Sequence, residues 1–121
     1  MNSAITDWID NVLNTVIPER IVAFCFNLYE EGDGNWSMEL VGSDWFDPED
    51  GDWACNEITD FGSRENLYMW KMNCDWEESL AYMIQELKEY LANGARAELL
   101  KSKAGVGVGF VDGDIEILYS K

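Results

Sequence analysis

Residues 20–30, RIVAFCFNLYE, decide how this chain folds. They are rich in β-branched and aromatic side chains, which favour a strand. Both faces of that strand would be largely apolar: one carries Val22, Phe24, Phe26 and Leu28, and the other carries Ile21, Ala23, Cys25 and Tyr29. Because a strand of this kind normally lies inside a sheet and is covered on part of each side, we predict that it is an interior strand.

Turn residues after this strand predict neighbours that pair with it through short connections. The segment 31–35, EGDGN, tolerates positive φ and predicts a hairpin into a second strand at 36–40, which has one apolar face. Shorter patterns predict strands at 53–59 and 67–72. Asp112-Gly113 lies between two alternating runs, 106–111 and 114–119, and predicts a second hairpin.

Two amphipathic helices are expected to cover this sheet. Ser3 is placed to cap the first, which runs for about fourteen residues at helical spacing until Pro18 stops it. Asp75 and Glu78 form a capping-box pattern at the start of the second, and Gly94 stands where its C-cap is expected. The apolar stripe of this second helix comprises Trp76, Leu80, Met83, Ile84, Leu87 and Leu91. A short further helix is expected at 95–101.

The length and composition fit one folded domain. The chain has 121 residues, and 47% of them are hydrophobic, enough to form a core despite the high charge. The order of predicted elements is helix, strands, helices and hairpin. We therefore predict a single α+β domain over residues 1–121: a twisted, mostly antiparallel sheet packed by an N-terminal helix and a longer central helix.

The net charge of −16, from 24 acidic and 8 basic residues, limits the partners of the chain. Direct binding to nucleic acid or to an anionic membrane is disfavoured, because the phosphates would be repelled. No stretch approaches the roughly 18 apolar residues of a membrane span, and the N-terminus, MNSAITDWID, lacks the pattern of a signal peptide. We expect a cytoplasmic protein with a basic protein partner.

The chain lacks the residues that several catalytic mechanisms require. The chain has no His, which removes Ser-His-Asp and Cys-His nucleophiles and imidazole zinc sites. Cys25, Cys55 and Cys74 form no CxxC pair and are expected to be reduced, buried thiols. The acids at 47–52 could offer oxygen ligands to Ca²⁺ or Mg²⁺, but their spacing does not follow the EF-hand pattern. We therefore predict a protein that is not an enzyme, with no cofactor and no functional metal.

The stretch 43–60, SDWFDPEDGDWACNEITD, is the candidate functional segment. It holds seven carboxylates and no Lys or Arg. Its Pro and Gly residues predict an exposed turn at 47–52, although such a charge run is more often only a solvated surface. Since the acids surround aromatic side chains, we predict that the segment binds a basic partner. The candidate contact residues are Asp44, Trp45, Asp47, Glu49, Asp50, Asp52, Trp53 and Glu57.

The tryptophans divide into two groups. Trp8, Trp36 and Trp76 fall on apolar faces of predicted elements and are expected in the core. Trp45 and Trp53 flank the acidic turn, with no apolar stripe to include them. They could contact a partner, since Trp often carries binding energy at interfaces, or they could tuck under the loop and hold it. The sequence leaves both alternatives open.

The glycine run at 105–109, GVGVG, resembles a phosphate loop only superficially. Such loops lie between a strand and a helix, whereas here a strand pattern continues through the glycines. The glycines are better explained by close approach of another element to that face, and the first helix is the candidate.

These features together resemble the small acidic immunity proteins that bacteria make against polymorphic or contact-dependent-inhibition toxins. The shared features are a single α+β domain, a strongly negative charge, no catalytic His, and the segment SDWFDPEDGDWACNE as a docking surface. The resemblance implies that the protein binds and neutralises a basic toxin domain, such as a nuclease, by occlusion. The acids of the segment would then stand in for nucleic-acid phosphates, and Trp45 or Trp53 would fill a pocket of the toxin.

Two other functions fit the same sequence. One is a DNA-mimic or regulatory adaptor protein that captures a basic DNA-binding protein. The other is a small enzyme that depends on a divalent cation, with carboxylates as ligands or as acid and base.

Overall fold

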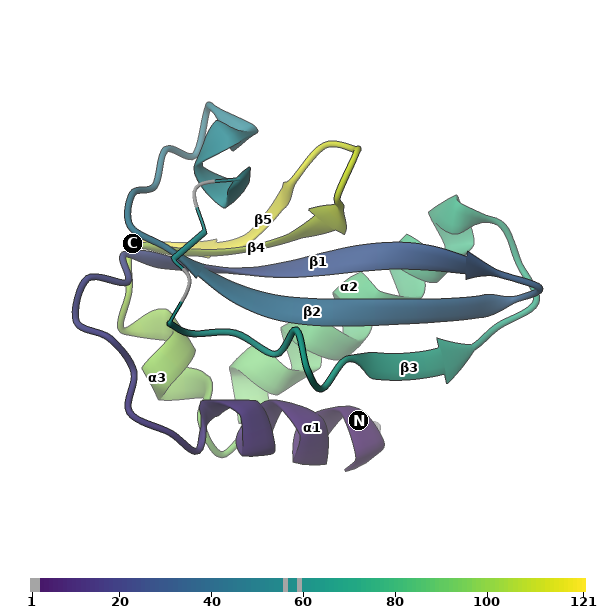
Figure 1. Cartoon of the computed structure of the whole chain (residues 1–121), viewed down its shortest axis with the longest axis horizontal. Helices are drawn as coiled ribbons and strands as arrows, with labels where there is room; N and C mark the ends of the chain where they lie inside the picture. The colour runs from purple at the N-terminus through teal and green to yellow at the C-terminus, as the bar shows by residue number, and fades with distance from the viewer. Residues whose placement is uncertain (1–2, 56, 59) are drawn as a thin grey trace.

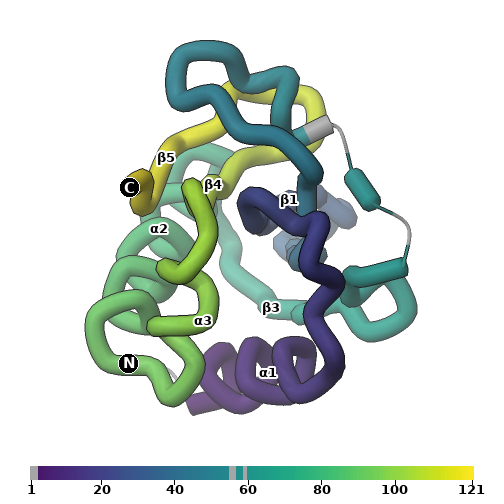
Figure 2. Tube along the Cα trace, turned by 90° about the vertical axis from the view of Figure 1, so that its left-hand side faces the viewer, coloured from purple at the N-terminus to yellow at the C-terminus, as the bar shows by residue number. Residues whose placement is uncertain are grey.

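A mixed sheet with β1 at its centre forms the middle of the protein, and the α-helices lie on one of its faces (Figures 1 and 2). The structure is a computed structural model that describes residues 3–55, 57–58 and 60–121. Its elements are α1 (Ser3–Leu13), β1 (Ala23–Gly32), β2 (Asn35–Ser43), the 3₁₀-helix η1 (Gly51–Cys55), β3 (Tyr68–Lys71), α2 (Trp76–Asn93), α3 (Ala97–Lys101), β4 (Gly105–Phe110) and β5 (Glu116–Ser120). The predicted α+β class is confirmed.

In the described part of the chain, the strand order is β3-β2-β1-β4-β5. β1 pairs antiparallel with β2, with Phe26 opposite Leu40, and parallel with β4, with Phe26 opposite Val108. β2 with β3 and β4 with β5 are antiparallel pairs. The predicted interior strand is confirmed, although β1 spans Ala23–Gly32 rather than residues 20–30. The parallel pair follows from the long connection through α2 and α3, which returns the chain to the same end of the sheet.

The main core lies between the sheet and the helices. Alternate side chains of β1, β2 and β4 face the helices, as the period of two requires. Buried members from the strands are Phe24, Phe26, Leu28, Met38, Leu40, Val106 and Val108, and those from the helices include Ile5, Ile9, Leu13, Met83, Leu87 and Leu100. This core holds the helices against one face of the sheet. The opposite face is left for other segments of the chain.

The helix ends follow the predicted signals in part. Asp75 caps α2, because its Oδ1 accepts from the Glu78 N–H at 2.9 Å, and Gly94 is the C-cap. α1 is shorter than predicted: it ends at Leu13, and Val16 is 89% exposed. The helix is followed by a turn in which the Asn14 N–H donates to Asn11 O, so α1 ends well before Pro18.

The predicted core tryptophans are not all buried. Trp8 and Trp36 are buried, and their indole N–H groups donate to Asn66 O and Met72 O. Trp76, however, is 52% exposed, so its predicted core position is wrong. It is the first residue of α2 and is not part of the main core, and its ring meets Phe110 at the end of β4 edge-on.

Candidate functional site

The acidic loop, residues 44–57, leaves β2 and covers part of the sheet face that the helices do not cover (Figure 1). Two of its acids shape it. Asp47 Oδ1 accepts from the Glu49 N–H at 2.9 Å, and Asp50 Oδ1 accepts from the Asp52 N–H at 3.0 Å. Asp side chains that bond backbone two residues ahead are typical of turns. The predicted exposed turn is therefore present.

The strand predicted at 53–59 is wrong for the residues that the structure describes. Residues 51–55 form η1, and of this stretch only Glu57 makes a bridge, antiparallel to Ser43. The turn bonds at Asp47 and Asp50 curl the chain into a 3₁₀ turn before any extended pairing begins. Residues 56 and 59 lie outside the described residues.

A small second core anchors the acidic loop to the sheet. Trp53 is fully buried against Ala23, Cys25 and Val41, and its ring meets Phe46 edge-on at 4.9 Å between centroids. The Ser43 hydroxyl also bonds the loop backbone, donating to the carbonyl oxygen of Trp53 at 2.7 Å. Of the two alternatives for Trp53, the structure shows the ring that holds the loop, so Trp53 offers no surface to a partner.

The glycines of β4 make room for this anchor. A Cβ on Gly105 would lie 2.3 Å from Phe46 Cε1, and one on Gly107 would lie 2.8 Å from Trp53 Cζ2. The packing explanation for the glycine run is therefore supported, but the first helix is the wrong element. The close approach comes from the acidic loop, on the face opposite α1.

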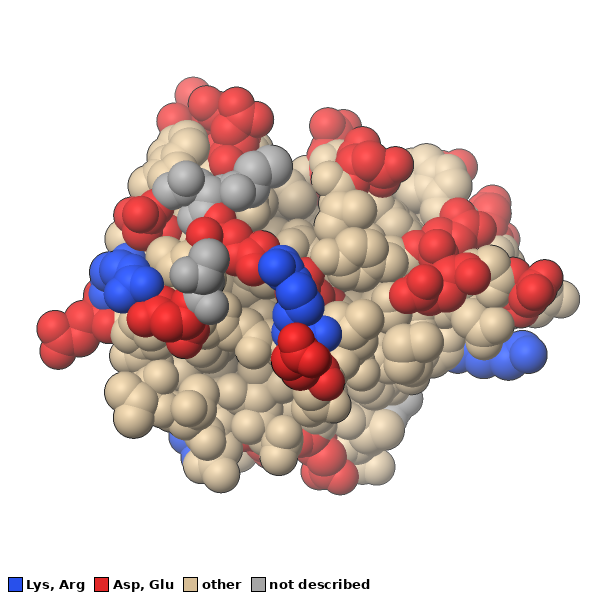
Figure 3. Space-filling model, viewed as in Figure 1, with Lys and Arg blue, Asp and Glu red and all other residues tan. Residues whose placement is uncertain are grey.

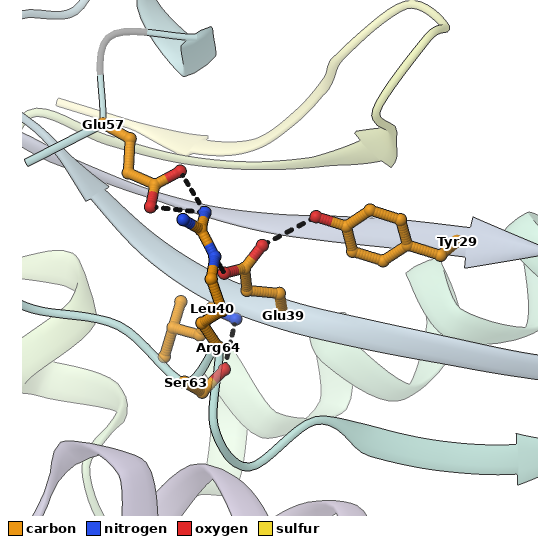
Figure 4. Close-up of polar contacts among 6 residues, drawn as sticks. All are labelled: Tyr29, Glu39, Leu40, Glu57, Ser63 and Arg64. Atoms are coloured by element: carbon orange, nitrogen blue, oxygen red, sulfur yellow. Dashed lines mark hydrogen bonds and ion pairs between the residues drawn. The ribbon is translucent and has the colours of Figure 1, made fainter. Parts of the chain in front are cut away.

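Arg64 ties the acidic loop to the sheet by charge (Figure 4). Its Nε donates to Glu39 Oε2 at 3.0 Å, and its Nη2 donates to both oxygens of Glu57 at 2.7 and 2.9 Å. Glu39 is only 2% exposed and also accepts from the Tyr29 hydroxyl at 2.7 Å. Burial, together with this hydrogen bond, raises the pKa of Tyr29 to about 12. Neighbouring Ser63 fixes the Arg64 segment, since the Leu40 N–H donates to Ser63 Oγ at 2.8 Å.

An acidic cleft of about 600 Å³ opens between the acidic loop and the β4–β5 turn. Figure 3 shows red side chains over both walls, with a hollow between them. Asn27 and Tyr29 of β1 contribute to its lining, together with Ile115 and Ile117. The acidic lining residues are Glu49, Asp52, Glu57 and Asp114. Since no Lys or Arg occurs among the described residues that line it, the cleft presents a negative field on a partly apolar surface.

The predicted site residues fall into three groups. Glu49, Asp52 and Glu57 line the acidic cleft, although Glu57 is already paired with Arg64. Three more acids and one aromatic lie on the loop outside the cleft lining: Asp44, Asp47, Asp50 and Trp45. Trp45 is 37% exposed, and Trp53 is buried beneath the loop. The loop therefore brings part of the predicted surface together.

Residues from distant segments also line the cleft, and the sequence patterns do not predict their place there. Asp114 and Ile115 belong to the β4–β5 connection, and Tyr29 to β1, yet all three line the cleft. The sequence predicts the Asp112-Gly113 turn, but the position of that turn beside the acidic loop depends on the parallel pairing of β1 with β4. No local signal in the sequence indicates that pairing.

The described cysteine side chains differ in exposure. Cys25 is buried, Cys74 is partly exposed, and the side chain of Cys55 lies outside what the structure describes. Among the described residues, no group of three or more Cys, Asp or Glu is arranged to hold a metal ion. Within the same residues, no helix has the length and apolarity needed to cross a membrane.

The chain matches no protein-family model, no curated protein and no solved structure in the three comparisons made.

Proposed function

We propose that this chain is an immunity-type protein that binds a basic toxin domain at the acidic cleft and neutralises it by occlusion. The observation that carries the proposal is the lining of the cleft, which holds four carboxylates, one of them paired with Arg64, and no Lys or Arg among the described lining residues. Such a surface concentrates negative potential and attracts a cationic partner. Nuclease domains carry cationic surfaces that bind nucleic acid. This protein would cover such a surface when it docks through the cleft.

The acidic loop is organised before any partner arrives. Trp53 and Phe46 fix it from below, and Arg64 fixes its end through Glu57. A preorganised loop loses little conformational freedom on binding, so more of the interaction energy contributes to affinity. Glu49, Asp52 and Asp114 would pair with partner Lys or Arg side chains, while the exposed part of Trp45 would add an apolar contact.

The proposal is tested with the toxin domain that is encoded by a gene next to the gene of this chain. Co-expression should restore the growth of cells that produce the toxin domain, and the purified chain should inhibit the activity of that domain. The cleft variant Glu49→Gln/Asp52→Asn/Asp114→Asn should associate roughly tenfold more slowly at low salt and depend less on salt concentration. Asp47 and Asp50 are kept because their side chains shape the loop.

A matched control removes the same charge elsewhere. Asp7, Glu19 and Glu98 are exposed acids outside the cleft lining, and their triple amide variant should associate nearly as fast as the parent. Equal association rates for the cleft variant and the parent would show that the cleft is not the docking surface. If the captured partner is instead a repressor or a restriction protein, the DNA-mimic hypothesis replaces the toxin hypothesis.

A further inference from the structure

We propose that a second groove, formed around Trp76, Phe110 and Val111, receives an apolar side chain from a basic segment of the partner. This inference rests on the proposed function and names the chemistry of the partner segment. The groove has a volume of about 550 Å³ and is lined by Trp76, by Phe110 to Gly113, and by residues 28–31 of β1. It adjoins the acidic cleft, since Tyr29, Val111 and Gly113 line both.

The apolar part of the groove is packed against a buried ring on one side and exposed on the other. Phe110 meets the buried Trp36 ring at 5.9 Å between centroids and the Trp76 ring at 6.1 Å, both edge-on. Trp76 and Val111 remain 52% and 50% exposed. Exposed apolar surface that clusters around a fixed ring is typical of an interaction site. The groove therefore offers a ready pocket for an aliphatic side chain.

The charges around the groove select the occupant. Glu30, Glu31 and Asp112 line it, and no Lys or Arg occurs among the described lining residues. Asp75 and Glu77 flank Trp76 in sequence and are exposed. The Ser37 hydroxyl donates to Glu31 Oε2 at 2.6 Å and holds that carboxylate in place. An aliphatic residue between Lys or Arg residues complements this pattern. A second copy of the chain, with its net charge of −16, does not.

The test uses two capped pentapeptides as probes: Lys-Lys-Leu-Lys-Lys, and the same peptide with Ser in place of Leu. Binding is followed by NMR through the Trp76 indole N–H and the backbone amides of the acidic loop. The Leu peptide should shift the Trp76 signal and bind about tenfold more tightly than the Ser peptide, because only Leu buries apolar surface. Trp76→Ala should abolish that difference, whereas Met69→Ala, a change at an exposed apolar residue outside the groove, should preserve it.

The two proposals can fail separately. Equal affinity for both peptides, or a Trp76→Ala variant that keeps the preference for Leu, would overturn the groove inference. Shifts of the loop amides by the Ser peptide would still support the acidic cleft in that case. If the Leu peptide shifts Trp76 while neither peptide shifts the loop amides at low salt, the groove inference stands and the cleft loses its role. A Leu peptide with Glu in place of each Lys should not bind, and its binding would contradict the selection by charge.

Discussion

Gly107→Ala tests whether the acidic loop is anchored by close packing on β4. The new Cβ would lie 2.8 Å from both Trp53 Cζ2 and Ile115 Cγ2, whereas carbon atoms at their optimal separation lie about 3.5–4.0 Å apart. Because Trp53 is fully buried, its ring has little space to retreat. Overpacking of this kind costs about 1–3 kcal/mol, and Ala recovers about 0.5–1 kcal/mol of backbone entropy relative to Gly. The difference spans about 0–2.5 kcal/mol, and because two contacts are closer than 3.0 Å we expect a net loss of about 1–2 kcal/mol in the free energy of unfolding.

The assay is equilibrium unfolding in urea, followed by far-UV circular dichroism. Gly51→Ala is the control, since its Cβ would meet Ile115 Cγ1 at 3.8 Å, an ordinary contact, and should change stability by less than about 0.5 kcal/mol. In a Trp53→Phe background, Gly107→Ala should cost less, because Phe lacks the part of the ring that the Cβ meets, while the contact with Ile115 Cγ2 remains. A neutral Gly107→Ala, or an equal cost in both backgrounds, would refute the packing explanation.

Three further predictions concern the charges. The pKa of Tyr29 is about 12 in the folded protein, above the ordinary value of 10.0, so stability that is present below pH 10 should fall as the pH rises toward 12. Tyr29→Phe should lose less stability over that interval, as measured by urea unfolding. Arg64→Met leaves the buried Glu39 without its ion pair and should lower the melting temperature, and Glu39→Gln in addition should recover part of the loss. NaCl should raise the melting temperature by screening the net charge of −16, and CaCl₂ at equal ionic strength should raise it no further. A specific rise at micromolar Ca²⁺ would instead favour the metal-dependent hypothesis.

Much of the fold follows from local sequence patterns. The apolar run at 20–30 predicts the central strand, Asp75 with Glu78 predicts the start of α2, and Asp112-Gly113 predicts the last hairpin. Each of these depends on residues close together in the chain. Trp76 shows where periodicity fails, because a helix can extend past the core that its apolar stripe is expected to meet.

The candidate site was less predictable, because it depends on contacts between distant segments. The sequence predicts an exposed acidic turn but cannot show that Trp53 anchors it while Trp45 remains partly exposed. That difference arises in part from the glycines of β4, since Gly105 leaves space for Phe46 and Gly107 leaves space for Trp53. It depends in turn on the pairing of β4 with β1.

The acidic loop keeps its shape despite its charge because its apolar anchor does not involve its exposed carboxylates. Trp53 and Phe46 pack beneath it, and Ser43 bonds its backbone. Its exposed carboxylates Glu49 and Asp52 take no part in those contacts, whereas Asp47 and Asp50 are used in the turn. Exposed charges that are not part of a packed core contribute little to stability when changed singly. The surface of the cleft can therefore be altered at Glu49 and Asp52 to suit a different cationic partner while the fold beneath it stays the same.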